Sequence, residues 1–126
     1  MSQNKYPLQD KTYVLNGLAM EVHRNLKPGL SEVLYKDAFQ FELDQKGIIY
    51  EREKEYEVEY KGTNLKHKFY ADFVVMNEII IEVKAQKGIH ELASSQVLNY
   101  LAISKCKVGL LYNFGESSLA IKRYVL

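Results

Sequence analysis

The stretch DFVVMNEIIIEVK, from Asp72 to Lys84, decides the fold of this protein. It holds two apolar runs, FVVM and IIIEV, which are rich in β-branched and aromatic residues and are separated by a polar Asn-Glu pair. This pattern predicts two adjacent buried strands joined by a tight turn. Asp72 opens the first strand, whereas Glu82 and Lys84 close the second. Charged side chains are rarely buried without a partner or a chemical task, so a site is expected at this end of the sheet.

The positions of the three charged residues predict that their side chains converge. Side chains alternate between the two faces of a strand, so Glu82 and Lys84 project from the same face, roughly 6 to 7 Å apart. If Asp72 lies alongside across the turn, two carboxylates and an ammonium meet. The spacing Glu-x-Lys is a weak signal alone, because residues 59–61 (EYK) repeat it within an exposed charged stretch.

Two interpretations of this arrangement are open on the residues alone. Close carboxylates drive each other toward the neutral form unless a cation balances them, and Mg²⁺ prefers hard oxygen ligands of this kind. Asp72, Glu82 and Lys84 are then similar to a site for phosphodiester hydrolysis, in which the lysine orients or deprotonates a water. The other interpretation, a buried ion pair that serves the structure only, fits the residues equally well.

Two helices are predicted before this stretch. Apolar residues recur at helical spacing over residues 8–26, and a second helix is predicted over residues 31–46. On the second helix, Glu32, Tyr35 and Phe39 share one face. Glu32 therefore either lies along an aromatic stripe or simply favours the positive end of the helix dipole.

A charged hairpin is predicted between the second helix and Asp72. Glutamates alternate with apolar residues over 55–60, and lysines do so over 65–72, so the hairpin would set glutamates against lysines. Strict alternation would also place Lys66 and Lys68 on the face of Asp72, unless a bulge intervenes.

A third helix is predicted over residues 88–104, followed by two closing strands at 108–112 and 119–126. Gln96 falls on the core-facing side of this helix, where an amide must find hydrogen-bond partners. It therefore either supports a buried polar site or lies at the mouth of a cleft. The predicted core-facing stripe consists of Ile89, Leu92, Ala93, Gln96, Tyr100 and Ile103.

The composition bounds the class of protein. The chain has 126 residues, 47% of them hydrophobic and 26% charged, and is predicted to form one globular domain over residues 1–126. The net charge of +1 indicates that nucleic-acid binding needs a local patch. Cys106 is the single cysteine, which excludes an intramolecular disulfide and a thiolate-cluster zinc site. A cytoplasmic location without membrane insertion is expected, because no apolar signal region or membrane-length run is found.

Five spaced motifs follow one another along the chain: PGLSEVLY at 28–35, YADFVV at 70–75, IEVKA at 81–85, QVLNYL at 96–101 and GLLYNFG at 109–115. They resemble the motifs of the small GxxExxY proteins, a branch of the PD-(D/E)XK nuclease superfamily. The resemblance implies an α/β fold with a restriction-endonuclease-like core, in which a mixed four- to five-stranded sheet is flanked by helices. Ala71 replaces the proline that often precedes the superfamily's aspartate, a common departure within this branch.

By this resemblance, five residues would form the site. Asp72 and Glu82 would hold a divalent cation, Mg²⁺ or Mn²⁺, and Glu32 would be the helix-borne acid among the metal ligands. Lys84 would be the catalytic lysine, and Gln96 would contribute its amide from the third helix. These five side chains are expected to meet in one pocket.

The expected function is that of a Mg²⁺-dependent nuclease that hydrolyses nucleic-acid phosphodiester bonds, with DNA as the expected partner. The alternative is a non-catalytic nucleic-acid- or protein-binding module that retains the fold. The retained Asp72, Glu82 and Lys84 favour the enzyme. The near-neutral charge and the short chain favour the module, or a homodimer with a shared binding surface.

Overall fold

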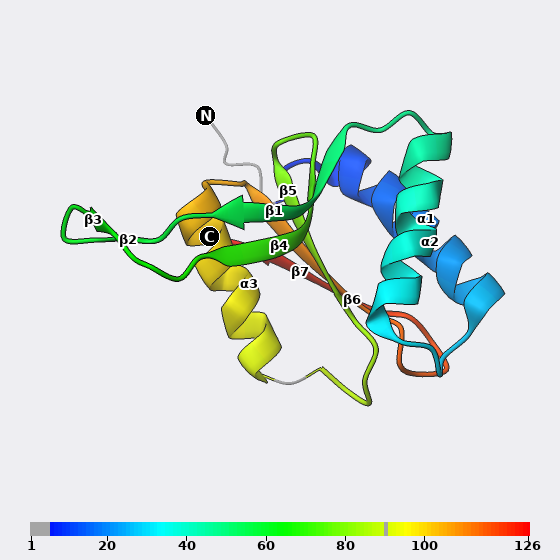
Figure 1. Ribbon diagram of the computed structural model, residues 1–126. Coiled ribbons are helices and arrows are strands. Elements are labelled where there is room, and N and C mark those ends of the chain that lie inside the picture. Colours follow the sequence, from blue (N-terminus) through cyan, green and yellow to red (C-terminus); the bar gives the residue numbers. More distant parts are fainter. Residues whose placement is uncertain (1–5, 90) are drawn as a thin grey trace.

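A five-stranded mixed sheet forms the centre of the computed structural model, which describes residues 6–89 and 91–126 (Figure 1). In spatial order, its strands are β1 (Tyr50–Tyr56), β4 (Phe69–Val75), β5 (Ile79–Lys84), β6 (Val108–Asn113) and β7 (Ala120–Val125). Neighbouring strands are antiparallel except β5 and β6, which are parallel. The predicted α/β architecture is therefore confirmed. The expected absence of a signal region concerns the N-terminus, and residues 1–5 of it lie outside the described residues.

Helices cover both faces of the sheet (Figure 1). α1 (Gln9–Leu26) and α2 (Glu32–Gln45) pack on one face, and α3 (Glu91–Ser104), which connects the parallel strands β5 and β6, packs on the other. The isoleucines of β5 (Ile79–Ile81) are fully buried, because this strand has a helix layer on each side. Burial of each such side chain contributes about 1.5–3 kcal/mol to stability.

α1 and α2 match the predicted helices, but α3 buries a different side from the one predicted. Ala93, Val97 and Leu101 are buried against the sheet at a spacing of four residues. Gln96 lies beside this row and is half-buried. Of the predicted stripe only Ala93 belongs to this buried row, so the stripe was placed too far round the helix. Two members of the predicted stripe are exposed to solvent: Leu92 is 81% exposed and Ile103 is 38% exposed.

The charged hairpin leaves the body of the molecule as a protruding arm (Figure 1). Its tip consists of β2 (Glu59–Tyr60) and β3 (Thr63–Asn64), joined by two residues with positive φ. A two-residue turn of this kind matches the twist of the strands that it joins. Nearer the body, the Lys68 ammonium lies 3.2 Å from the Glu55 carboxylate, so lysine and glutamate do face each other across the hairpin.

The alternation of side chains breaks at Asp72. β1 and β4 pair on either side of Glu53 and Asp72 but not at these two residues. Glu53 has a φ of 54°, in the left-handed region that is strained for a residue with a side chain. Ala71 packs toward α3, whereas Phe73 packs toward α1 and α2. The strict alternation that would place the two hairpin lysines on the face of Asp72 is therefore broken at Asp72 itself.

Asn113, at the end of β6, fixes the loop that follows Lys84. Its side chain is fully buried, and its Oδ1 accepts hydrogen bonds from the backbone N–H groups of Gln86 (3.0 Å) and Gly115 (3.1 Å). Its Nδ2 donates to the carbonyl oxygens of Gln86 (2.8 Å) and Gly88 (2.9 Å). These bonds satisfy the buried amide and hold the loop against the end of β6.

Gly115 is expected to be intolerant of a side chain. A Cβ at this position would lie 2.3 Å from the backbone N and O of Gln86. We expect Gly115→Ala to lower the free energy of unfolding by about 1–3 kcal/mol, the usual cost of overpacking. Gly17 in α1 is the matched control, because nothing lies within 4 Å of its Cβ position. Gly17→Ala should stabilise by roughly 0.5–1 kcal/mol. Urea unfolding measures both effects, and equal shifts in the two variants would contradict this packing argument.

Candidate active site

Two hydrogen bonds connect Asp72 with Glu82 and Val83 at the end of β5, where β4 and β5 separate. The last paired residues of the two strands are Phe73 and Ile81. Beyond them, the backbone N–H of Asp72 donates to Glu82 Oε2 at 2.7 Å, and the backbone N–H of Val83 donates to Asp72 Oδ2 at 2.8 Å. Each carboxylate thus takes the place of a backbone acceptor on the opposite strand. The two acids are held together where the sequence predicted their convergence.

Glu82 is the most perturbed acid of the site. Its side chain is only 4% exposed. Burial, followed by the neighbouring Asp72 carboxylate, raises the pKa of Glu82 to about 8. The hydrogen bond from the Asp72 backbone and the ammonium groups of Lys84 and Lys36 lower this pKa, but they do not offset the burial. The carboxyl group of Glu82 therefore tends to keep its proton at neutral pH unless a further cation binds beside it.

Lys84 and Gln96 line one cavity between the end of β5 and α3. The cavity has a volume of about 220 Å³, and Gln86, Leu92 and Ala93 complete its lining. Gln96 thus lines a cleft together with Lys84. The loop that Asn113 holds forms one wall of this cavity through Gln86.

Tyr100 on α3 is a further polar residue close to the acid pair. Its ring stacks on that of Phe69 with a centroid distance of 4.2 Å and an interplanar angle of 6°. Burial and the carboxylates of Glu82 and Asp72 raise the pKa of Tyr100 to about 12. Its hydroxyl therefore stays protonated at neutral pH and can donate a hydrogen bond. From its position in the sequence, this residue was expected only to pack on the third helix.

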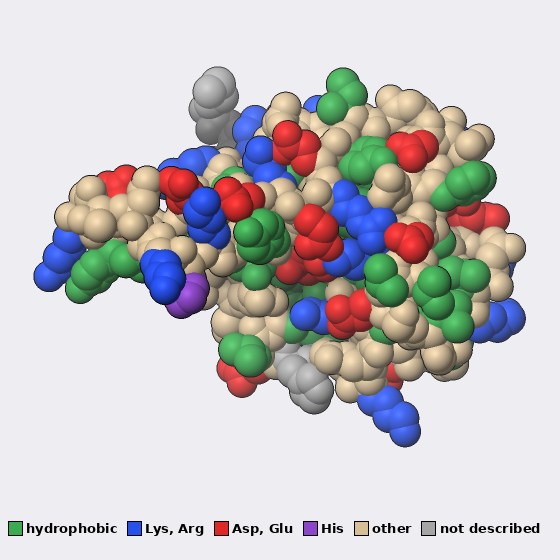
Figure 2. Space-filling model, in the orientation of Figure 1, with side chains coloured by type: hydrophobic (Ala, Val, Ile, Leu, Met, Phe, Trp, Pro, Cys, Tyr) green, Lys and Arg blue, Asp and Glu red, His purple; other side chains and the backbone are tan. Residues whose placement is uncertain are grey.

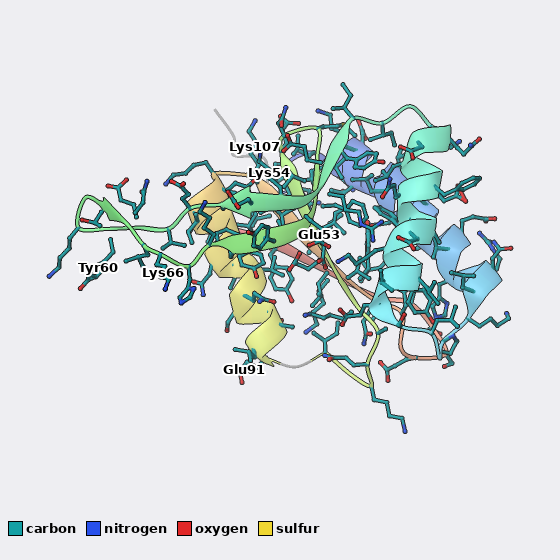
Figure 3. All side chains as sticks on the ribbon, viewed as in Figure 1. Glu53, Lys54, Tyr60, Lys66, Glu91 and Lys107 are labelled. Carbon is teal, nitrogen blue, oxygen red and sulfur yellow. The ribbon has the colours of Figure 1, made fainter. Side chains whose placement is uncertain are left out.

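Lys36 on α2 is a charged residue of the site that was not predicted from the sequence. Its Nζ lies 3.0 Å from Asp72 Oδ1 and also bonds the carboxylate of Glu53. Burial lowers the pKa of Lys36, but the bonds to Glu53 and Asp72 more than offset that effect and raise it. Figure 3 shows Glu53 in the middle of the molecule, and Figure 2 shows acidic and basic side chains side by side on this face. A sequence signal existed, since Lys36 lies one helical turn after Glu32.

Glu32 is exposed in the first turn of α2. Within residues 6–89 and 91–126, no hydrogen bond or ion pair joins it to the other four predicted site residues, and no three His, Cys, Asp or Glu side chains gather to hold a metal. Its role as a third metal ligand stays a prediction. Asp72 and Glu82 alone still fit Mg²⁺, because this ion is commonly held by one or two carboxylates together with water and substrate phosphates.

Comparison with known proteins gives one family and one fold. A model of the PD-(D/E)XK nuclease superfamily matches residues 9–124. The crystal structure of SSO0001 is similar in fold, with a TM-score of 0.58 and 22% identity over 75% of this chain. The chain spans 50% of the length of that protein. The search of curated proteins finds no match. Across the part of the chain that the structure describes, no helix combines the length and apolar character needed to cross a bilayer.

The raised pKa of Glu82 predicts how stability changes with pH in EDTA. The unfolded carboxyl ionises near 4.5, whereas the folded one ionises near 8. The unfolded state therefore loses its proton first, and the Glu82 contribution to stability falls as pH rises through this window. Glu82→Gln cannot ionise but can still accept the hydrogen bond from Asp72. We expect it to be more stable than wild type at pH 8, by roughly 1–4 kcal/mol, and nearly equal to it at pH 4.5.

Thermal unfolding at the two pH values measures this effect. Glu59→Gln, at an exposed position on the hairpin arm, is the control and should change little at either pH. A large loss of melting temperature for Glu82→Gln at pH 8 would instead support a structural ion pair, because removing one partner of a buried pair is strongly destabilising.

Proposed function

This chain belongs to the PD-(D/E)XK nuclease superfamily, and we propose that it is a nuclease of the GxxExxY branch that hydrolyses nucleic-acid phosphodiester bonds with Mg²⁺ or Mn²⁺. The observation that carries the proposal is the buried Glu82 carboxyl, held against Asp72 with its pKa raised to about 8. Such a pair is costly to ionise in the absence of a cation. It is therefore suited to bind one.

In this proposal Asp72 and Glu82 hold the divalent cation. Both offer hard carboxylate oxygens, and each carboxylate accepts one backbone N–H hydrogen bond that fixes its orientation. A bound Mg²⁺ would supply charge stabilisation for the phosphate and lower the pKa of a water molecule. Glu32, which is exposed in the first turn of α2, would join Asp72 and Glu82 as the helix-borne acid among the metal ligands.

Lys84 and Gln96 act on the attacking water and the phosphate. Lys84 projects from the same face of β5 as Glu82, and its charge lowers the pKa of that acid. In the proposed reaction its ammonium orients the water, or its neutral amine takes a proton from the water. Gln96 lines the same cavity as Lys84 and can bind the water or a phosphate oxygen through its amide. The protonated hydroxyl of Tyr100 can donate to a phosphate oxygen from α3.

DNA as substrate, a homodimeric state and a cytoplasmic location are further parts of this proposal. The net charge of +1 gives little general attraction to nucleic acid, so affinity must come from local groups. A homodimer would enlarge the surface available to a duplex. The free thiol of Cys106, which is buried, suits a reducing compartment.

A binding module without catalysis is the second candidate. The ion pair between Lys36 and Asp72 favours it, because this contact already neutralises one of the two acids. Under this interpretation the acids and lysines would stabilise the fold, and nucleic acid would bind without being cut.

Substitution of Lys84 tests the proposed chemistry. Lys84→Ala should lose turnover by ~10²-fold or more while still binding metal and nucleic acid, because its contribution is made mainly in the transition state. Asp72→Ala should lose metal binding as well. The assay is cleavage of labelled duplex, branched and single-stranded DNA and RNA with each metal.

Lys87 provides the matched control for the loss of one nearby lysine. It is exposed three residues after Lys84, and Lys87→Ala should retain most of the turnover. Binding without metal-dependent cutting on every substrate would move the protein to the module interpretation. Equal cutting by wild type and Lys84→Ala would point to a contaminating nuclease.

A further inference from the structure

We propose that Lys36 is the resident counter-cation of Asp72 in the metal-free protein, and that its ammonium must release Asp72 and stay on Glu53 when a divalent cation binds. Lys36 would then set the metal affinity of the site. This inference rests on the proposed metal site at Asp72 and Glu82.

The contacts of Lys36 place its ammonium where a metal ion would compete with it. The Nζ lies 3.0 Å from Asp72 Oδ1, while Asp72 Oδ2 accepts the backbone N–H of Val83. Both oxygens of Asp72 are therefore engaged. The side chains of Lys36 and Asp72 are 13% and 16% exposed, so water screens this pair poorly. A divalent ion on the same carboxylate would face a nearly buried positive charge.

The position of Lys36 is fixed by aromatic residues on either side of it in α2. Tyr35 and Phe39 are both fully buried. The Tyr35 ring stacks on Phe114 at 4.7 Å, and the Phe39 ring meets the edge of Phe73, the neighbour of Asp72, at 5.3 Å. This packing anchors the helix beside the end of the sheet. The ammonium of Lys36 can therefore move through rotation of its own side chain while the helix stays in place.

Glu53 is placed to receive the ammonium that leaves Asp72. It faces Asp72 across the β1–β4 hairpin, at the point where the two strands do not pair and where its own φ is 54°. Its carboxylate already bonds Lys36 and is 48% exposed. An exposed carboxylate keeps a lysine at little cost, so Lys36 can give up Asp72 without becoming an unpaired charge.

The test is binding of Mn²⁺, followed through the spectroscopic signal of the free ion, in protein without nucleic acid. Lys36→Met should bind Mn²⁺ roughly tenfold more tightly than wild type, because no ammonium competes for Asp72. In EDTA the same variant should melt at a lower temperature, since Asp72 loses its partner. Glu53→Gln should bind Mn²⁺ more weakly, because Lys36 has no alternative acceptor.

A double variant separates this competition from a general change of charge. Lys36→Met and Glu53→Gln together leave the net charge of the site unchanged. Competition predicts that the double variant binds Mn²⁺ more tightly than wild type, whereas a field effect alone predicts equal affinity and would overturn the inference. Lys68→Met is the control, because Lys68 pairs with Glu55 in the same hairpin, outside the acid pair. Its affinity should equal that of wild type.

The outcomes also distinguish this inference from the proposed function. If wild type binds Mn²⁺ and cuts nucleic acid but the double variant binds no more tightly, only the inference fails. If neither wild type nor the Lys36 variants bind Mn²⁺, the metal site and the inference fail together. Tight binding by Lys36→Met in a protein that cuts no substrate would support the inference and leave the module interpretation in place.

Discussion

The structure depends on the exchange of hydrogen bonds between Asp72 and the end of β5. Because the Asp72 backbone donates to Glu82 and the Val83 backbone donates to Asp72, these two N–H groups keep acceptors where β4 and β5 stop pairing. The separation opens the sheet at one end. Lys36 of α2 bonds Asp72 here, and Tyr100 of α3 lies close enough for both acids to raise its pKa.

Charge compensation at this opening is incomplete. Lys36 pairs with Asp72, but Glu82 keeps a raised pKa despite the nearby Lys84 and Lys36. A protein selected for stability alone would replace such a group by an apolar one of similar size, since buried ionisable pairs seldom add net stability. The presence of the buried acid therefore argues for a functional role of this site. The strained backbone of Glu53 supports the same conclusion, because such strain is common at functional sites.

Much of this arrangement could be predicted from sequence, and the rest could not for identifiable reasons. Apolar runs with charges at their ends predicted β4, β5 and the meeting of Asp72 with Glu82. Helical spacing placed Lys36 near Glu32 but could not predict its contact with Asp72, because that contact depends on the left-handed Glu53 and on the break in alternation at Asp72. The buried row of α3 was misplaced because several apolar residues on this helix, Leu92 among them, face solvent.

The hydrogen bonds of Asn113 with the loop after Lys84 bear on the order in which the parts of the chain fold. The β4–β5 hairpin joins near neighbours in the chain, so the acid pair needs only local contacts. The loop after Lys84 reaches its final position only when Asn113 arrives through parallel pairing of β6 with β5, across the whole of α3. Long-range parallel pairing is slow compared with hairpin formation. We therefore expect the acid pair to form before the loop after Lys84 and the cavity beside α3.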